Sequence, residues 1–323
     1  MRLARGGVLL TVWALTAGWP RGRLDGRLRR DGWQRIWRGA WAAPGKEVDW
    51  RMRAAAAQLL RPQLVCSHRT AAAVHRIELL GGRAGTEGAP EPLEFTARRG
   101  RGSKAHEPIR VHTTARLADA DCATRRGLRV TSAVRTVGDL IRAAASREAA
   151  VVVADSALSP RFVAGLHRPP LVDAAGLAAE LAAPRRPGGP SARRWLPLAV
   201  AGSGSPAETV ARLRMRDAGL HPETQPTLHT AAGRPLHPDF LFRAAGLVVE
   251  IEGFAFHGTR AAHERDVRRF NELQSCPDVR RVLRFTAGEV FGHPDRMTAT
   301  IRAALASLTA TGRPGPGYRP GPG

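Results

Sequence analysis

The sequence predicts a multidomain α+β protein. Its 323 residues, of which 43% are hydrophobic, are enough for two or three domains with separate cores. Patterns typical of helices and of short strands alternate along the chain. The clearest interruption is the Pro/Gly-rich segment PRRPGGP at 184–190. We therefore expect a linker over 185–204, followed by a C-terminal α/β domain with a mixed central sheet.

Composition points to a polyanionic partner. The chain has 50 Lys and Arg against 28 Asp and Glu, a formal charge of +22, which favours nucleic acid. Its three cysteines show no spacing typical of a zinc site or of paired disulfides. The first residues resemble a secretory signal but lack a clear cleavage site, and no apolar run is long enough to cross a membrane. We expect a cytoplasmic protein with no membrane partner.

Residues 1–46 predict two helices and a β-ribbon. The helices are expected over Val8–Ala17 and Arg21–Asp31, and residues 33–41 alternate large apolar with polar side chains. This order is that of a winged helix-turn-helix, whose basic helix lies in the major groove of DNA. The alternative is a small domain that only packs against its neighbours. The arginines expected to face DNA are Arg21, Arg23, Arg27, Arg29 and Arg30 on the helix, with Arg35 and Arg38 on the ribbon.

Residues 47–184 predict a mixed α+β middle domain. A helix over Trp50–Leu60 precedes several short strand patterns, and Ser132 is placed to cap a helix that carries Arg135 and Asp139 four residues apart. The motif GWQRIWRGAWAAPG at 32–45 and the Arg135-Thr136 pair with Asp139 resemble AbiEi-type antitoxins. That resemblance implies a DNA-binding regulatory region before the C-terminal domain.

A predicted β-hairpin carries the candidate chemistry. Two apolar runs, 240–242 and 247–249, flank a four-residue break that ends in glycine. With the turn centred in that break, Asp239 faces Glu250 across the hairpin, and Glu252 falls on the same side as Glu250. Three carboxylates close together need compensation. A hard divalent cation such as Mg²⁺ or Mn²⁺ can supply it, so all three are candidate ligands.

The same stretch resembles the very-short-patch-repair-like endonuclease domain of the PD-(D/E)xK superfamily. The matching residues cover about the last third of the chain and are Pro238-Asp239, Glu250-Ile251-Glu252-Gly253, His257, Arg265-Asp266 and the strand Arg281–Phe285. The resemblance implies a restriction-endonuclease-like fold over 205–310 that hydrolyses phosphodiester bonds. It also places His257 near the scissile phosphate. Glu252 stands where the superfamily carries a lysine, which leaves open the group that activates water.

Glu208 has two interpretations that remain open. Ser205, Pro206 and Glu208 have the spacing of a helix capping box, which needs no function. The endonuclease resemblance instead places an acidic residue of this first helix at the catalytic site. The arginines expected to bind backbone phosphates in this domain are Arg260, Arg265, Arg268, Arg269 and Arg284.

Taken together, these patterns predict a Mg²⁺- or Mn²⁺-dependent DNA endonuclease delivered by a winged helix. Duplex DNA is the expected substrate, because aromatic residues make up only 5% of the chain and most tryptophans fall near the N-terminal segment. One alternative is a non-catalytic transcriptional regulator or antitoxin of the AbiEi type, and another is RNA cleavage. The Pro/Gly-rich tail, 311–323, is expected to be disordered.

Overall fold

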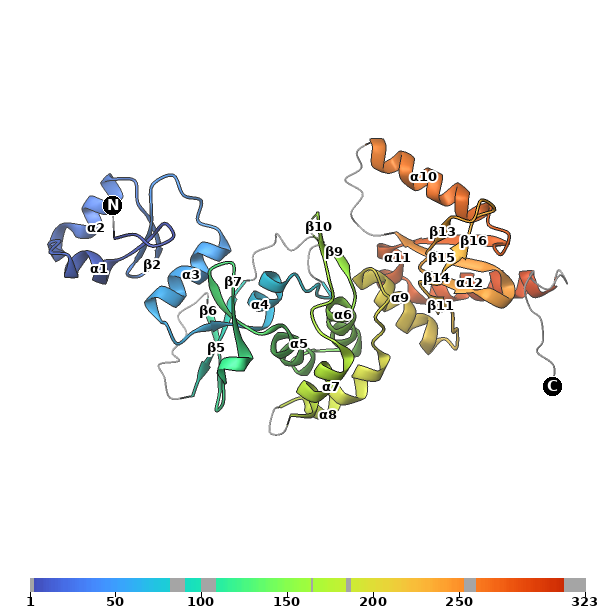
Figure 1. Cartoon of the computed structure of the whole chain (residues 1–323), viewed down its shortest axis with the longest axis horizontal. Coiled ribbons are helices and arrows are strands. Elements are labelled where there is room, and N and C mark those ends of the chain that lie inside the picture. Colours follow the sequence, from blue (N-terminus) through green and yellow to red (C-terminus); the bar gives the residue numbers. More distant parts are fainter. Residues whose placement is uncertain are drawn as a thin grey trace. The chain divides into compact units, whose positions relative to one another are not determined.

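The computed structural model describes a mixed α+β chain (Figure 1). The chain divides into two compact units, which are Met1–Ile77 with Thr86–Leu140, and Glu78–Gly85 with Ile141–Gly323. Within the described residues, no helix has both the length and the apolar character needed to cross a membrane. The described ranges are 3–81, 91–99, 109–163, 165–183, 187–252 and 260–310, without the side chains of 260–263, 265 and 266.

The first unit begins with a three-stranded antiparallel sheet of order β1-β3-β2 and two helices. The elements are β1 (Val8–Leu10), α1 (Thr11–Thr16), α2 (Arg21–Arg30), β2 (Gln34–Trp37) and β3 (Ala40–Ala42). Leu24 and Leu28 of α2 are buried, as their four-residue spacing predicts. The prediction that a helix begins at Val8 is wrong for residues 8–10, which form β1. These residues pair with β3 and are buried, because an apolar run this short suits a strand as well as a helix.

The rest of the first unit is built on a five-stranded sheet of order β6-β5-β4-β8-β7. Its helix α4 begins after Ser67, but the Ser67 side chain does not cap it. The buried carboxylate of Glu94 does so, because its Oε2 accepts the Arg69 N–H at 2.8 Å. The elements are α3 (Trp50–Leu60), β4 (Val65–Cys66), α4 (His68–His75), β5 (Leu93–Arg98), β6 (Ile109–Thr114), η1 (Asp119–Asp121), β7 (Cys122–Arg125), β8 (Leu128–Thr131) and α5 (Ala133–Arg142), whose last residues belong to the second unit.

The second unit opens with helices and one hairpin. They are α6 (Arg147–Leu158), β9 (Arg161–Val163), β10 (Leu166–Arg168), α7 (Ala174–Ala182), α8 (Gly189–Trp195) and η2 (Leu196–Leu198). The predicted linker at 185–204 therefore contains α8 and η2, both of which contact α6. Pro190 lies in the first turn of α8, and Gly188 precedes the helix with φ +77°. The Pro/Gly signal thus marks a helix start within the unit.

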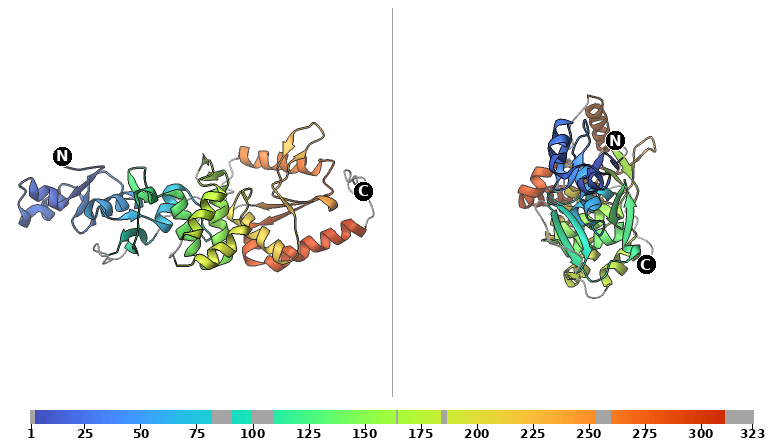
Figure 2. Two further views of the ribbon diagram at one scale, coloured as in Figure 1. Left: turned by 60° about the horizontal axis from the view of Figure 1, so that its bottom comes forward. Right: turned by 90° about the vertical axis from the view of Figure 1, so that its left-hand side faces the viewer.

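A mixed four-stranded sheet follows in the second unit, in the order β11-β14-β15-β16, with β15 and β16 parallel and the other pairs antiparallel. Helices α9, α11 and α12 lie on one face and α10 on the other (Figure 2). The elements are α9 (Pro206–Asp217), β11 (Glu223–Thr224), β12 (Leu228–His229), β13 (Pro235–Leu236), β14 (Phe240–Phe242), η3 (Arg243–Ala245), β15 (Leu247–Glu252), α10 (Arg260–Gln274), β16 (Arg281–Thr286), α11 (Ala287–Gly292) and α12 (Pro294–Ala310).

The β14–β15 hairpin has the predicted register. Phe240 pairs with Val249, and Phe242 pairs with Leu247, so the turn is centred where the sequence places it. Gly246 closes the turn with φ +63°, and a Cβ there would lie 3.0 Å from the backbone oxygen of Asp278. The turn therefore requires glycine for both its conformation and its close approach to a neighbouring segment.

Asp155 of α6 joins α6 to α9 through a buried polar network. Its side chain is fully buried, and its Oδ2 accepts hydrogen bonds from Thr209 Oγ1 and from Arg212, each at 2.8 Å. Its Oδ1 accepts the Val200 N–H at 2.7 Å. One carboxylate thus holds three segments of the unit and neutralises a buried guanidinium.

Asp155→Ala is expected to lower the free energy of unfolding of the second unit by about 3–5 kcal/mol, because it leaves Arg212 buried without its charge partner. The matched control is Asp217→Ala, which removes a partly exposed pair with Arg147 and is expected to cost about 0–1 kcal/mol. Urea unfolding followed by circular dichroism measures both. Equal costs for the two variants would contradict the role given to Asp155.

Candidate functional site

Three acidic side chains and one amide lie next to one another at one end of the hairpin. Gln225 Nε2 donates to Glu208 Oε2 at 3.2 Å and to Asp239 Oδ1 at 3.1 Å. The other Asp239 oxygen, Oδ2, accepts the Ile251 N–H at 2.8 Å, and the Asp239 N–H lies 3.3 Å from Glu250 Oε1. The structure therefore brings together Glu208, Asp239 and Glu250, which we call the carboxylate cluster.

Gln225 is the member of the site that the sequence analysis missed. It follows β11, its N–H donates to the Asp239 carbonyl at 2.9 Å, and it thus extends the β11–β14 pairing by one residue. Its φ of +49° is uncommon for a residue other than glycine. Backbone conformations of this kind are concentrated at functional sites. Only the β11–β14 register reveals that Gln225 faces Asp239, and two-residue strands give too little pattern to predict a register.

The structure supports part of each interpretation of Glu208, as a member of a capping box and as a member of the acidic site. The Glu208 N–H donates to Ser205 Oγ at 3.2 Å, so Ser205 caps α9 as its spacing predicts. The Glu208 carboxylate does not return to the backbone of Ser205, as a complete capping box requires. It accepts the Gly204 N–H at 2.6 Å and the Gln225 amide instead. Glu208 is 7% exposed, and its carboxylate belongs to the cluster.

Burial gives the carboxylate cluster an unusual proton affinity. Loss of hydration, reinforced by the negative charge of Asp239, raises the pKa of Glu208 from 4.5 to about 7 and that of Glu250 to about 7. Burial also raises the pKa of Asp239, although the Ile251 N–H opposes that rise. Near neutral pH the cluster therefore holds protons that ordinary carboxylates release.

Two arginines contact the acidic residues of β15. Arg269 NH1 lies 3.2 Å from Glu250 Oε2, and Arg269 NH2 donates to the His237 carbonyl at 2.8 Å. Arg284 Nε lies 2.8 Å from Glu252 Oε1. Arg269 and Arg284 were expected to bind phosphate, and in this structure their side chains contact glutamates. Glu252 accordingly has a partner of its own beside the cluster.

Several predicted residues are placed in other ways. His257 lies outside the described residues, as do the side chains of Arg260 and Arg265. Arg268 is exposed on α10, and its Nε donates to the Glu264 carbonyl at 3.3 Å. The arginines expected to face DNA from the first unit are all exposed there, namely Arg21, Arg23, Arg27, Arg29 and Arg30 on α2, Arg35 on β2 and Arg38 after it.

The donor set suits a divalent cation held by two protein carboxylates. Among the described residues, no three His, Cys, Asp or Glu side chains form a group able to hold a metal ion. The predicted ligand set of Asp239, Glu250 and Glu252 is therefore not assembled. Mg²⁺ commonly uses one or two carboxylates, completed by water and substrate phosphate. Asp239, together with either Glu208 or Glu250, provides such a pair.

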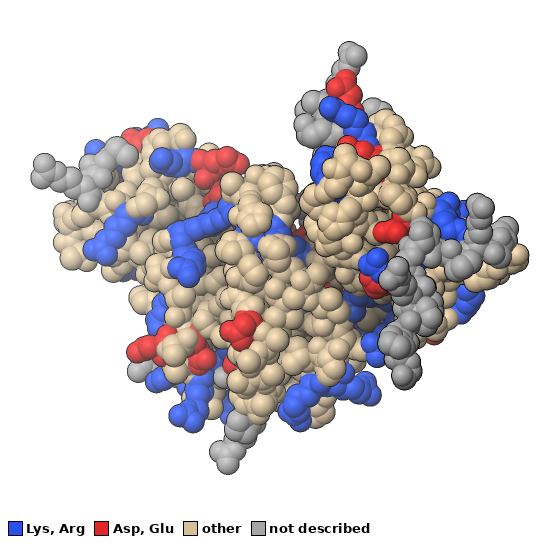
Figure 3. Space-filling view, turned by 45° about the vertical axis from the view of Figure 1, so that its right-hand side comes forward, with Lys and Arg blue, Asp and Glu red and all other residues tan. Residues whose placement is uncertain are grey.

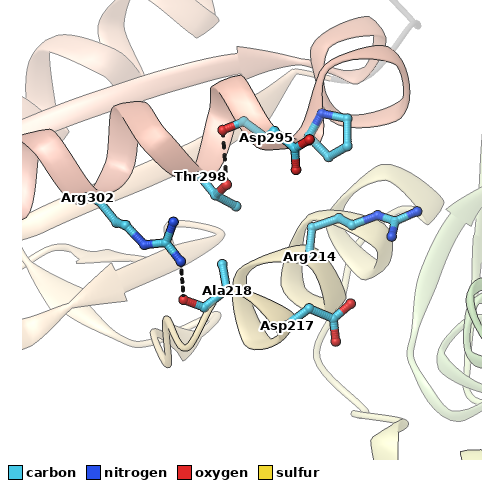
Figure 4. Close-up of a pocket in the computed structure, with 7 residues that line it drawn as sticks. Arg214, Asp217, Ala218, Asp295, Thr298 and Arg302 are labelled. Carbon is cyan, nitrogen blue, oxygen red and sulfur yellow. Dashed lines mark hydrogen bonds between the residues drawn. The ribbon is translucent and has the colours of Figure 1, made fainter.

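A separate polar cavity of about 270 Å³ lies between the C-terminal end of α9 and the start of α12 (Figure 4). Arg302 NH2 donates to the Ala218 carbonyl at 2.5 Å across it. Asp217, on its wall, is held by Arg147. No residue of the carboxylate cluster lines this cavity, and Arg214 on its wall lies 3.6 Å from Glu148. The lining residues are Arg214, Asp217, Ala218, Pro294, Asp295, Thr298 and Arg302.

Comparisons with known proteins add no assignment. The chain matches no protein-family model, and a search of curated proteins finds no match. The carboxylate cluster and the charge of the chain are therefore the features from which a function can be inferred.

The raised pKa values predict a stability that falls as pH rises. A carboxyl group that binds its proton more tightly in the folded state stabilises the fold below its unfolded pKa of about 4.5 and loses this effect as pH rises through about 7. The free energy of unfolding of the wild type should therefore decrease between pH 5 and pH 8. Glu250→Gln should remove about 2 kcal/mol of that decrease.

Urea unfolding at half-unit pH steps, without divalent cations, measures this effect in both proteins. Subtracting the two curves cancels the titrating groups that do not interact with Glu250, so the difference reports Glu250 together with the carboxyl groups beside it. Parallel curves for wild type and Glu250→Gln would show that Glu250 titrates normally in the folded state.

Proposed function

We propose that this chain is a metal-dependent DNA endonuclease whose catalytic centre is the carboxylate cluster. The observation that supports this proposal most strongly is the burial of Glu208, Asp239 and Glu250 beside one another with raised pKa values. Perturbed carboxyl groups of this kind cluster at functional sites, because burying them is otherwise unfavourable. The net charge of +22 supplies the attraction to a polyanionic substrate.

Each residue of the cluster has a defined task in this proposal. Asp239 and Glu208 hold the Mg²⁺ or Mn²⁺ ion, and Gln225 orients both carboxylates through the hydrogen bonds that its amide donates. When bound, such an ion polarises the scissile phosphate and lowers the pKa of a water molecule. Glu250, with a pKa of about 7, is suited to accept a proton on a carboxylate oxygen near neutral pH. Arg269 holds Glu250 in place.

The architecture of the second unit is consistent with a restriction-endonuclease-like domain. Asp239 directly precedes β14 and Glu250 lies on the adjacent β15, within a mixed sheet that has helices on both faces. This is the arrangement that the resemblance to the very-short-patch-repair-like family implies. We also propose a cytoplasmic location, because three cysteines without a disulfide spacing suit a reducing compartment.

The start of the first unit is consistent with a winged helix that binds the duplex. Helix α2 exposes its arginines and is followed by the β2–β3 ribbon, which exposes Arg35 and has Arg38 in its turn. On the face of the molecule in Figure 3, Lys and Arg side chains are spread widely and Asp and Glu are fewer. Basic side chains of this kind position a protein on the DNA backbone without reading its sequence.

The second candidate function is a non-catalytic DNA-binding regulator of the AbiEi type. The observation that favours it is the pairing of Glu250 with Arg269 and of Glu252 with Arg284. These arginines neutralise two of the three predicted ligands without an ion. A regulator would keep its affinity for DNA when the cluster is altered, whereas an endonuclease would lose its activity.

Asp239→Asn is expected to abolish cleavage, with a loss of about a hundredfold or more in rate, because it removes a carboxylate at the centre of the cluster. The assay is nicking of supercoiled plasmid by the full chain in Mn²⁺ or Mg²⁺, with single-stranded DNA and RNA as parallel substrates. Chelation by EDTA should have the same effect as the substitution.

Glu223→Gln is the matched control, since Glu223 is an exposed carboxylate of the same sheet that pairs with Arg243. It should cleave as the wild type does. If the wild type binds DNA but cleaves none of the three substrates with either ion, the endonuclease proposal fails and the regulator takes its place.

A further inference from the structure

Arg269 of α10 contacts the carboxylate cluster and is also accessible to solvent. Its NH1 lies 3.2 Å from Glu250 Oε2, and its NH2 lies 3.3 Å from Glu250 Oε1. The same NH2 donates to the His237 carbonyl at 2.8 Å. The Arg269 side chain is 42% exposed, whereas that of Glu250 is 12% exposed. Arg269 is therefore open to a ligand in solution while it is paired with a buried carboxylate.

The ion pair between Arg269 and Glu250 is looser than its neighbour in the same sheet. Hydrogen bonds between a guanidinium and a carboxylate are commonly about 2.7–2.9 Å long, and both contacts of Arg269 with Glu250 are longer. Arg284 Nε lies 2.8 Å from Glu252 Oε1, and its guanidinium lies 5.1 Å from the centre of the Phe270 ring. A shorter ion pair and an aromatic ring thus hold Arg284. Arg269 is the more readily released of the two arginines.

The charge of Arg269 opposes a cation in the carboxylate cluster. Glu250 Oε1 lies 3.3 Å from Arg269 NH2 and 3.3 Å from the Asp239 nitrogen, so one carboxylate separates the guanidinium from Asp239. Burial raises the pKa of Asp239, and the charge of Arg269 opposes that rise. An ion bound by Asp239 would bring two further positive charges to a place where screening by water is weak. Ion binding is therefore disfavoured while Arg269 stays on Glu250.

A backbone phosphate is the ligand that best suits a released guanidinium. The planar fork of arginine donates two parallel hydrogen bonds to phosphate oxygens. Phosphate oxygens also complete the coordination of Mg²⁺ when a protein supplies only one or two carboxylates. DNA at the cluster would therefore neutralise Arg269 and supply oxygen ligands at the same time.

We propose that Arg269 moves from Glu250 to a backbone phosphate when DNA binds, and that this exchange couples DNA binding to ion binding at the carboxylate cluster. The exchange rests on the proposed function and adds a regulation of the same site. Ion and DNA then bind with positive cooperativity, each raising the affinity of the other by the same factor. The DNA-free protein accordingly binds the ion less tightly than the complex does.

Arg268 provides the matched control for charge. It precedes Arg269 by one position on α10, so its side chain points about 100° away around the helix. It is exposed, and its Nε donates to the Glu264 carbonyl at 3.3 Å. Arg268→Gln therefore removes one positive charge from the same helix and leaves the contact with Glu250 in place.

The test is calorimetric titration of Mn²⁺ into the full chain at pH 8, without DNA and with a saturating phosphorothioate duplex. The modified backbone resists cleavage, and a gel confirms that the duplex stays intact. The duplex should tighten Mn²⁺ binding by the wild type about tenfold. Without DNA, Arg269→Gln should bind Mn²⁺ about tenfold more tightly than the wild type, and the duplex should then add less than about threefold. Arg269→Lys, which keeps the charge, should bind Mn²⁺ as the wild type does when DNA is absent.

Each result decides the proposal. If Arg269→Gln and Arg268→Gln have the same Mn²⁺ affinity and the same response to the duplex, the exchange is overturned and the endonuclease proposal stands. A wild type that binds Mn²⁺ equally well with and without the duplex overturns the exchange as well. No Mn²⁺ binding by the wild type under either condition removes both proposals. Thermal melts confirm that the variants are folded, and the wild-type comparison needs no variant.

Discussion

The proposed function depends on the burial of three carboxyl groups in one place. Glu208 and Glu250 lose hydration and also feel the charge of Asp239, so the pKa of each rises to about 7. The hydrogen bond from Gln225 and the ion pair with Arg269 offset only part of the free energy that is lost when these charges are buried, since both pKa values remain raised. A fold has no structural need for such a group of acids. We propose that a ligand balances their charge, and a divalent cation on a phosphodiester substrate would do so.

The fold could be predicted where its signals are local. The β14–β15 hairpin follows from two apolar runs that end at Gly246, and helix α2 follows from the spacing of Leu24 and Leu28. Residues 8–10 could not be assigned in this way, because a three-residue apolar run takes its conformation from the distant strand that it pairs with. The Pro/Gly segment before α8 was read as a linker, since its sequence does not show that the following helix packs on α6.

The same distinction applies to the site. Asp239 and Glu250 could be paired from the sequence, because the hairpin turn sets their register. Arg284, the partner of Glu252, lies on β16, which pairs in parallel with β15 after a long helical connection, and no local pattern reveals that register. Gln225 comes from a two-residue strand. The acidic residues carry a chemical signal in the sequence, whereas the groups that orient and neutralise them become visible only in three dimensions.

We propose, as the central claim, that a divalent cation binds the carboxylate cluster. Its binding displaces protons that the carboxyl groups hold near neutral pH. Isothermal titration of Mn²⁺ into the full chain at pH 6.5, repeated in buffers of different ionisation enthalpy, measures the protons released on binding. Because Glu208 and Glu250 have pKa values of about 7, we expect saturable binding with release of about one proton for each ion. Absence of binding, or binding without proton release, would contradict this account of the site.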